Sequence, residues 1–395
     1  MKQTHRLLYI LLISLGAALS AVLLGAIVLE VLGKNPVAVY RVILTEPLKD
    51  LFGLTEIGVR MVPLILVGLG IAISFRSGIL NIGAEGQIQM GIIVAAATAI
   101  YLPPLPRAVM LPLVLLGGAL AGGLWAGIAG WLRARLNVSE LLSTVMLNYI
   151  AAQIYGFLLR GPMIDPAELQ VGSGTPQSVR LPKYAWIDRI IPGTRLHYGL
   201  VIAIVLAVLV YVLLWRTRWG YELRAAGAGP KAARYGGIKV ESCLVSAMVL
   251  AGAFAGLAGA VEVTGVHRRA IEAISSGYGF SGIVVALFGG LHPAGIVPSA
   301  FFFGLLLIGS DMTQRIMSVP ANMVLVLEGA VILSIISAKM LIADQYLFER
   351  FSRALERAGR RKGPESKEGP AAPAAILPSK DPSAPGRDAA EGGRS

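Results

Sequence analysis

The chain has 395 residues, of which 55% are hydrophobic and only 15% are charged. Soluble globular proteins carry about 45–50% apolar and roughly 25% charged residues, so this composition excludes a soluble cytosolic enzyme and indicates a membrane protein. The single cysteine, Cys243, excludes an intrachain disulfide. The net charge of +12 does not indicate nucleic-acid binding, because the basic residues are scattered between apolar runs. Basic residues that flank membrane segments account for this charge better.

Ten apolar runs are candidates to cross a bilayer, which takes about 20 helical residues. In chain order they cover residues 7–32, 57–75, 87–102, 109–132, 141–159, 198–215, 242–266, 280–291, 295–308 and 321–342. The third and eighth runs are short and adjoin glycine-rich stretches. Broken helices survive in a bilayer where protein or a water-filled cavity covers them, so these two runs mark the expected pathway. We therefore expect an all-α polytopic membrane protein with about ten transmembrane helices.

The N-terminal end of the chain is expected to be a membrane helix and the C-terminal end a disordered tail. The first run follows Lys2, His5 and Arg6 and is longer than the apolar part of a signal peptide, so it is expected to be a retained helix. Its basic flank and the even number of crossings put both termini in the cytoplasm. From about residue 347 the composition shifts to Arg, Lys, Glu, Pro, Ala and Gly. We expect residues 1–346 to form the transmembrane domain and residues 347–395 a disordered cytoplasmic tail.

A faint internal repeat links the two short runs. Four residues recur after 199 positions: Ser77, Gly78, Gly83 and Gly91 match Ser276, Gly277, Gly282 and Gly290. The first copy falls on the inner side of the expected topology and the second on the outer side. Inverted repeats of this kind place a binding site near the midplane of the membrane. Coincidence in a glycine-rich chain is the alternative.

Motifs for catalysis and for metal binding are absent from the sequence. No phosphate-binding loop occurs, so the chain is not expected to hydrolyse ATP itself. The four histidines lie far apart and show no metal-ligand spacing. Ser281 and His292 are eleven residues apart, which does not suit a protease pair on one helix face. We expect no catalytic residue, no metal site and no cofactor on this chain.

Polar residues interrupt the apolar chain in the stretch 76–87. Asn81 and Gln87 can donate and accept hydrogen bonds to a polar solute, and Glu85 can accept them from hydroxyl or amino groups. Polar groups in a membrane are functional by default, because burying them without partners costs several kcal/mol. The alternative is that they cap the ends of a broken helix.

A short basic segment lies between two membrane runs. In the stretch 224–238, Pro230 suits the first turn of a helix, and Gly236 and Gly237 would end it. Such a helix can dock into a groove on a soluble partner. The alternative is a helix that lies on anionic lipid.

Further candidates lie in later runs. Tyr278 and Phe280 can stack on a planar base or a sugar face, although packing is the alternative. Three lone polar residues occur within apolar runs and are expected to face the interior of the bundle: Asn148, Gln153 and Glu328. The residues alone do not decide whether solute or a neighbouring helix satisfies them.

Three stretches resemble one known family. Residues 77–87 read SGILNIGAEGQ, residues 228–238 read AGPKAARYGGI, and residues 288–295 read FGGLHPAG. They resemble bacterial ABC importer permeases for nucleosides and simple sugars, within the ribose and branched-chain amino-acid permease family. The resemblance runs from about residue 54 to residue 342. It implies the helical fold of vitamin B12-type importers, with a central path between two permeases.

The same resemblance implies partners and site residues. It implies cytoplasmic ATPase subunits that hold ATP and Mg²⁺, a second permease subunit and an external substrate-binding lipoprotein. The ATPase-contacting residues are then Pro230, Lys231, Ala232, Ala233, Tyr235, Gly236, Gly237 and Ile238. The candidate substrate path comprises Asn81, Glu85, Gln87, Asn148, Tyr278 and Phe280.

The sequence thus predicts a permease subunit in a bacterial plasma membrane, surrounded by lipid, that imports nucleosides or simple sugars while partner subunits hydrolyse ATP. One alternative is a secondary transporter driven by an ion gradient, which needs a relay of buried carboxylates such as Glu85, Glu262 and Glu328. Another alternative is a membrane scaffold without transport activity.

Overall fold

The computed structural model describes residues 2–31, 33–172 and 174–319, with ten single positions between 326 and 349. Within this part of the chain all regular elements are helices, and β pairing is confined to three isolated bridges. The prediction of an all-α protein is therefore confirmed for the described residues. The expected last run, 321–342, and the expected tail, 347–395, lie outside them apart from those single positions.

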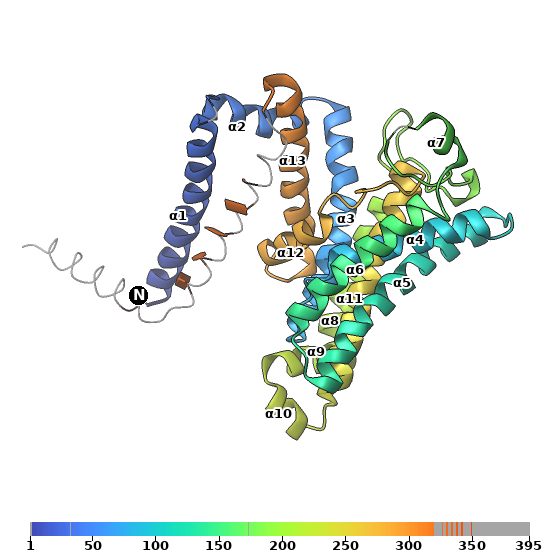
Figure 1. Ribbon diagram of the computed structural model, residues 1–395. Coiled ribbons are helices and arrows are strands. Elements are labelled where there is room, and N and C mark those ends of the chain that lie inside the picture. Colours follow the sequence, from blue (N-terminus) through green and yellow to red (C-terminus); the bar gives the residue numbers. More distant parts are fainter. Residues whose placement is uncertain are drawn as a thin grey trace, which may run out of the picture. The chain divides into compact units, whose positions relative to one another are not determined.

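The helices follow one another along the chain, with the longest connection, residues 172–198, between α7 and α8 (Figure 1). They are α1 (Lys2–Val31), α2 (Pro36–Thr45), α3 (Leu51–Arg76), α4 (Ala84–Tyr101), α5 (Arg107–Leu136), α6 (Glu140–Arg160), α7 (Pro166–Val171), α8 (Gly199–Arg216), α9 (Arg218–Ala228), α10 (Pro230–Tyr235), α11 (Val240–Val261), α12 (Tyr278–Phe288) and α13 (Pro293–Met317). Short 3₁₀ turns cover Glu46–Leu48 and Lys183–Ala185, and a π-helix, Glu262–His267, continues α11.

Six of these helices are long and apolar enough to cross a membrane: α3, α5, α6, α8, α11 with its π-helical end, and α13. A pair of segments bent by 120°, Leu19–Val31 and Pro36–Leu48, would make a seventh span. α12 is an apolar helix of 11 residues, too short to cross by itself. The expectation of a short, broken segment at residues 280–291 is confirmed.

The chain forms two compact units. One unit is Leu11–Ala343 and contains the helices from α2 to α13. The other comprises Met1–Ile10 and Asp344–Ser395, of which the structure describes the first turns of α1 and Glu349. The site described below lies in Leu11–Ala343.

α3 lies at the centre of the larger unit, because its residues 61–73 are apolar on all sides. In its most apolar window 89% of the residues are buried, whereas the helices around it keep an exposed apolar face. α11, α12 and α13 pack directly against α3 (Figure 1). A helix that is hydrophobic all round has no solvent-facing or lipid-facing side and forms the core.

Glycines allow α5 and α11 to approach closely. A Cβ atom at Gly122 would lie 2.3 Å from the carbonyl oxygen of Gly252, and one at Gly256 would lie 2.2 Å from that of Gly118. Backbone contact between small residues drives helix association in membranes, where no hydrophobic effect separates helix from lipid. The glycine spacing in these helices therefore serves packing.

Candidate functional site

Three stretches that carry the sequence motifs meet at one end of the helical unit. Arg76, at the end of α3, donates a hydrogen bond from Nε to the carbonyl oxygen of Leu291 (2.6 Å) and one from Nη2 to that of Gly290 (3.3 Å). Gly227 of α9 packs on the same turn, and a Cβ atom there would lie 2.2 Å from the carbonyl oxygen of Arg76. The structure thus joins the break after α3, the break before α13 and the connection between α8 and α11.

Aromatic and basic side chains hold this junction together. The guanidinium of Arg76 lies 4.7 Å from the centre of the Trp215 ring, and that of Arg224 lies 5.8 Å from it. The His292 ring is centred 4.6 Å from the Trp215 ring. Arg224 also donates a hydrogen bond to the carbonyl oxygen of Leu214 (3.0 Å). A cation over an aromatic face is attracted by the ring quadrupole, so these contacts fasten α9 to the end of α8.

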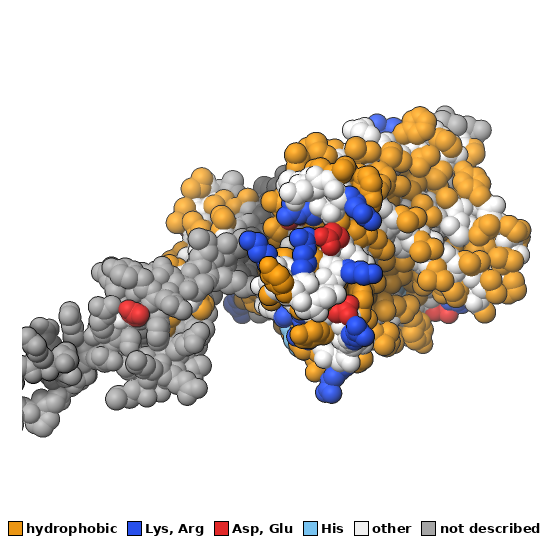
Figure 2. Space-filling model, turned by 90° about the horizontal axis from the view of Figure 1, so that it is seen from below, with side chains coloured by type: hydrophobic (Ala, Val, Ile, Leu, Met, Phe, Trp, Pro, Cys, Tyr) orange, Lys and Arg blue, Asp and Glu red, His pale blue; other side chains and the backbone are white. Residues whose placement is uncertain are grey.

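α10 forms the outermost part of this end. It begins at Pro230 and ends at Tyr235, and Gly237 adopts a positive φ of 82° directly afterwards. The prediction of a short helix with these limits is confirmed. Ala233 is buried, whereas 95% of Tyr235 is exposed. Figure 2 looks onto this end and shows Lys and Arg side chains gathered there; the exposed basic residues of the segment are Arg216, Arg218, Lys231, Arg234 and Lys239.

The amide side chains predicted to lie in the break between α3 and α4 bind to the protein itself. Asn81 and Gln87 are both buried, and their side-chain amides form two reciprocal hydrogen bonds of 3.0 and 2.9 Å. Asn148 of α6 accepts a hydrogen bond from the Gly86 amide (2.8 Å) and donates one to the carbonyl oxygen of Ile82 (2.9 Å). These contacts satisfy the backbone of the break, which matches the capping alternative.

Glu85 joins the start of α4 to the start of α12. Its carboxylate accepts hydrogen bonds from the amides of Gly277 (3.3 Å) and Gly279 (2.8 Å). A negative charge is stabilised at a helix N-terminus, where amide groups and the helix dipole point outward. Gly78 and Gly277, which correspond in the internal repeat, both have positive φ angles, of 81° and 77°. The backbone of the two copies agrees at this glycine, whereas the serines before it differ, with φ of −85° at Ser77 and 45° at Ser276.

The remaining predicted residues are not gathered at one place. Tyr278 is buried and its hydroxyl accepts a hydrogen bond from Nη1 of Arg60 (2.5 Å). Phe280 lies on the exposed side of α12, with 51% of its surface accessible. Gln153 is also exposed, on α6, so the expectation that it faces the interior is wrong for this chain by itself, because α6 buries only one of its faces. Glu328 lies outside the described residues.

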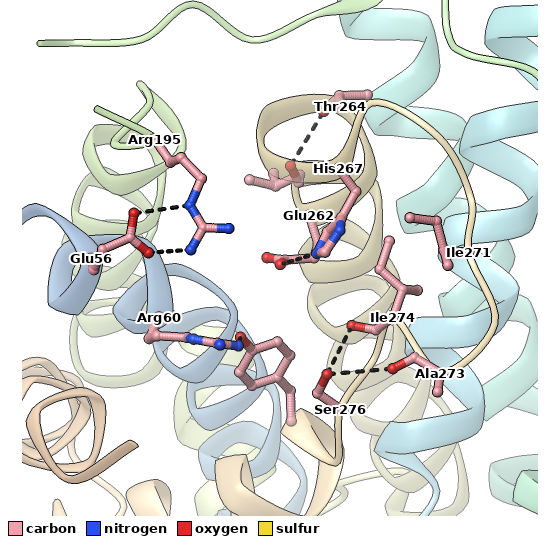
Figure 3. Close-up of polar contacts among 12 residues, drawn as sticks. Glu56, Arg60, Arg195, Glu262, Thr264, His267, Ile271, Ala273, Ile274 and Ser276 are labelled. Carbon is pink, nitrogen blue, oxygen red and sulfur yellow. Dashed lines mark hydrogen bonds and ion pairs between the residues drawn. The ribbon is translucent and has the colours of Figure 1, made fainter. Parts of the chain in front are cut away.

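A cluster of charged side chains near Tyr278 was not predicted (Figure 3). Arg60 of α3 binds Asp311 of α13 (3.2 Å) as well as Tyr278. Glu56 of α3 accepts two hydrogen bonds from the Arg195 guanidinium, one of them 2.9 Å long. Glu262 of the π-helix lies 3.3 Å from His267. The signal available in the sequence was Arg60 itself, a lone arginine in the apolar run 57–75, since charges within membrane segments mark functional sites by default.

Two members of the loop before α8 have shifted pKa values. The hydrogen bond to Glu56 raises the pKa of Arg195, so this guanidinium stays charged. Burial lowers the pKa of His197, whose Nδ1 accepts a hydrogen bond from the Gly199 amide (3.1 Å). His197 is therefore neutral at pH 7. Among the residues that the structure describes, no group of three or more His, Cys, Asp or Glu side chains is placed to hold a metal ion.

Comparison with known proteins identifies the family. Residues 53–336 match the family described as branched-chain amino acid transport system / permease component. A glucose ABC transporter permease of Haloferax volcanii is 36% identical over 81% of this chain and 86% of its own length. A guanosine ABC transporter permease of Bacillus subtilis is 33% identical, over 83% and 93%, and a nucleoside ABC transporter permease of Lactococcus lactis is 34% identical, over 81% and 89%.

These matches confirm the resemblance read from the three motifs. The match spans the helices from α3 to α13 and so includes both breaks, α9 and α10. Together with the six apolar helices, it makes the chain a multi-pass membrane protein and a transporter component rather than an enzyme. The chain belongs to the family of branched-chain amino acid transport system permease components.

Proposed function

We propose that this chain is the transmembrane permease subunit of an ABC importer that moves nucleosides, or simple sugars, into the cytoplasm. The observation that carries the proposal is the similarity to three permeases that are named for glucose, guanosine and nucleosides, each over more than four-fifths of this chain. The chain brings no ATP-binding motif of its own, so the proposal assigns ATP and Mg²⁺ to a partner ATPase.

The proposed topology has about ten crossings, an inverted-repeat arrangement and the fold of vitamin B12-type importers, in the bacterial inner membrane. The end that contains α9 and α10 is assigned to the cytoplasm, with both termini. The exposed basic residues of that end support this assignment, because loops rich in Lys and Arg remain on the cytoplasmic side. The positive φ angle that Gly78 and Gly277 share supports the repeat. Residues 1–346 form the proposed permease domain, and residues 347–395 the proposed tail.

The proposed partners are the ATPase, a second permease subunit and an external substrate-binding lipoprotein. The ATPase contact is assigned to α10 and the residues after it, Pro230–Ala233 and Tyr235–Ile238. The exposure of Tyr235 and the basic surface around it support a docking role. No nucleic acid is among the proposed partners.

The proposed mechanism transmits ATPase closure through α9. Gly227 of α9 and Arg76 of α3 are in backbone contact, and Arg76 binds the break before α13. A push on α10 therefore reaches both breaks without passing through a flexible linker. Movement of the breaks opens the path to one side of the membrane and closes it to the other, and ATP binding shifts the balance between these two states. The proposed path is lined by the six residues named above, from Asn81 to Phe280.

The test is reconstitution of this chain in proteoliposomes with the ATPase, second permease and lipoprotein of its own organism. We expect uptake of tritiated guanosine, or of labelled glucose, that requires ATP inside the vesicles and the lipoprotein outside. Uptake that continues without ATP and stops when an ion gradient is collapsed would contradict the proposal and select a secondary transporter. Uptake of neither solute under any condition would also contradict it.

A further inference from the structure

The charged cluster contains one carboxylate, that of Glu262, whose one contact described above is with His267. Figure 3 shows the Glu262 carboxylate directed toward Arg195 and Arg60 across the space between α3 and the π-helix. The cluster draws on α3, the loop before α8, the π-helix, α12 and α13. The cluster adjoins the proposed path, because its member Tyr278 lies between Gly277 and Gly279, whose amides bind Glu85.

The two arginines of the cluster already have partners. Arg195 makes its two hydrogen bonds to Glu56, and Arg60 binds Tyr278 and Asp311. Glu262 has His267 as its neighbour, at 3.3 Å, and throughout the described part of the chain its carboxylate receives no hydrogen bond. A carboxylate offers about four lone-pair positions to donors. Glu262 is therefore the member of the cluster with acceptor capacity to spare.

Burial makes this unused capacity costly. Only 5% of the Glu262 side chain is exposed, and the nitrogen of His267 at 3.3 Å reaches one of its two oxygens. A buried carboxylate with lone pairs left over is unfavourable. The cluster is nevertheless open on one side, since the exposed fraction rises to 47% for the Arg195 side chain. A ligand that donates hydrogen bonds can enter from that side and bind the Glu262 carboxylate.

The backbone that carries Glu262 has the form of a binding site. The π-helix is rare, and single turns of it within α-helices occur frequently at functional sites. Here it is fixed from outside, because His197 lies against Gly265, where a Cβ atom would come within 2.8 Å of the imidazole ring. A carboxylate on a backbone held in this way keeps one position, which is what recognition of a directional ligand requires.

The charges of the cluster select the class of ligand. Glu56, Asp311 and Glu262 place three carboxylates around the space, which disfavours a phosphate or carboxylate ligand by repulsion. A neutral ring with two adjacent hydroxyl groups suits Glu262, because each oxygen of a carboxylate can accept one hydroxyl proton. Ribose and hexose rings both present such a pair.

We propose that Glu262 is a solute-recognition residue that accepts hydrogen bonds from two adjacent ring hydroxyls of the transported nucleoside or sugar, with Arg60, Tyr278 and His267 around it. This inference rests on the proposed function and names the part of the solute that the permease itself recognises. The ligand class is a neutral polyhydroxylated ring, and the base of a nucleoside is not read at this position.

The experiment compares two labelled solutes in the reconstituted complex, guanosine and 2′,3′-dideoxyguanosine, with the lipoprotein saturated by each. Saturation removes the lipoprotein's own preference from the comparison. We expect Glu262→Gln to slow guanosine uptake about tenfold, since hydrogen bonds to charged groups contribute more than neutral ones, and to leave dideoxyguanosine uptake nearly unchanged. Glu272→Gln is the matched control, because Glu272 forms a surface pair with Arg160, and it should slow neither solute.

Three results would overturn the inference. Equal slowing of both solutes would show that Glu262 maintains the fold, and unchanged guanosine uptake would show that it does not contact solute; in both cases the proposed function stands. Failure of the wild-type complex to import guanosine or glucose would instead remove the proposed function. If only glucose is imported, glucose and 2-deoxyglucose replace the nucleosides. If Glu262→Gln does not assemble, Glu262→Asp, which keeps the charge but retracts it, should show the same selective loss to a smaller extent.

Discussion

Replacement of Gly227 by alanine tests the connection between α9 and the core most directly. The added Cβ would lie 2.2 Å from the carbonyl oxygen of Arg76 and 2.8 Å from the amide nitrogen of Gly78. Cβ atoms do not approach other heavy atoms closer than 3.0 Å, and both neighbours are backbone atoms that cannot rotate away. The two segments must therefore separate by about 1 Å, and overpacking of this kind costs about 1–3 kcal/mol.

We expect Gly227→Ala to weaken the transmission of ATPase movement without removing the ATPase. The variant should still bind its partners and hydrolyse ATP, because α10 itself is unchanged. The number of guanosine molecules imported per ATP hydrolysed should fall several-fold. The measurement is parallel determination of uptake and phosphate release in proteoliposomes.

Gly229→Ala is the matched control, two residues away in the same segment. Its Cβ would meet Ala232 at 3.8 Å, an ordinary contact, and its φ of −165° suits any residue. The reasoning is refuted if the two variants import equal numbers of guanosine molecules per ATP.

Three further predictions concern stability and are checked by thermal unfolding in detergent. Gly122→Ala should lower the free energy of unfolding by about 1–3 kcal/mol, because its Cβ would lie 2.3 Å from a backbone oxygen of α11. The control Gly156→Ala, whose Cβ would have no atom within 4 Å, should be neutral or slightly stabilising. Equal losses of stability in the two variants would contradict the packing argument. The protein should lose stability as the pH falls below about 6.5, because His197 takes up a proton at that pH in the unfolded chain, whereas burial lowers its pKa in the folded chain. His197→Gln should flatten this dependence of stability on pH. An unchanged slope in the variant would contradict the role of His197. Arg195→Ala should destabilise the fold by roughly 1–3 kcal/mol, because it leaves the buried Glu56 carboxylate without its donors. Adding Glu56→Gln should recover part of this loss. A double variant no more stable than Arg195→Ala would exclude a charge effect.

The sequence predicted the helices of this fold better than it predicted which helices contact one another. Apolar runs reveal membrane helices because the thickness of the bilayer sets their length, and the limits of α10 follow from Pro230 and Gly236. Even the break before α4 was visible as an interruption of the apolar pattern. These features depend on local chemistry, which a single sequence records.

The partners of the polar residues were not predictable in the same way. Arg60 and Asp311 are 251 positions apart, and Glu56 and Arg195 are 139 apart. No periodicity connects such pairs, because their meeting depends on how α3 is placed among the other helices. The reciprocal bonding of Asn81 and Gln87 depends likewise on the irregular backbone between them, whose path hydrophobic patterns do not specify.

The contact of Glu85 with α12 has a consequence for how this protein can change over time. Because Glu85 binds main-chain amides, a new side chain on the outward face of α12, for example at Phe280, does not remove what it binds. Gly277 and Gly279 are the exceptions, because Gly277 has a positive φ of 77° and a Cβ atom at Gly279 would lie 2.3 Å from the backbone nitrogen of Glu85. One acidic residue and two glycines thus preserve the join between two helix starts, while the exposed side chain of Phe280 beside them is free to vary.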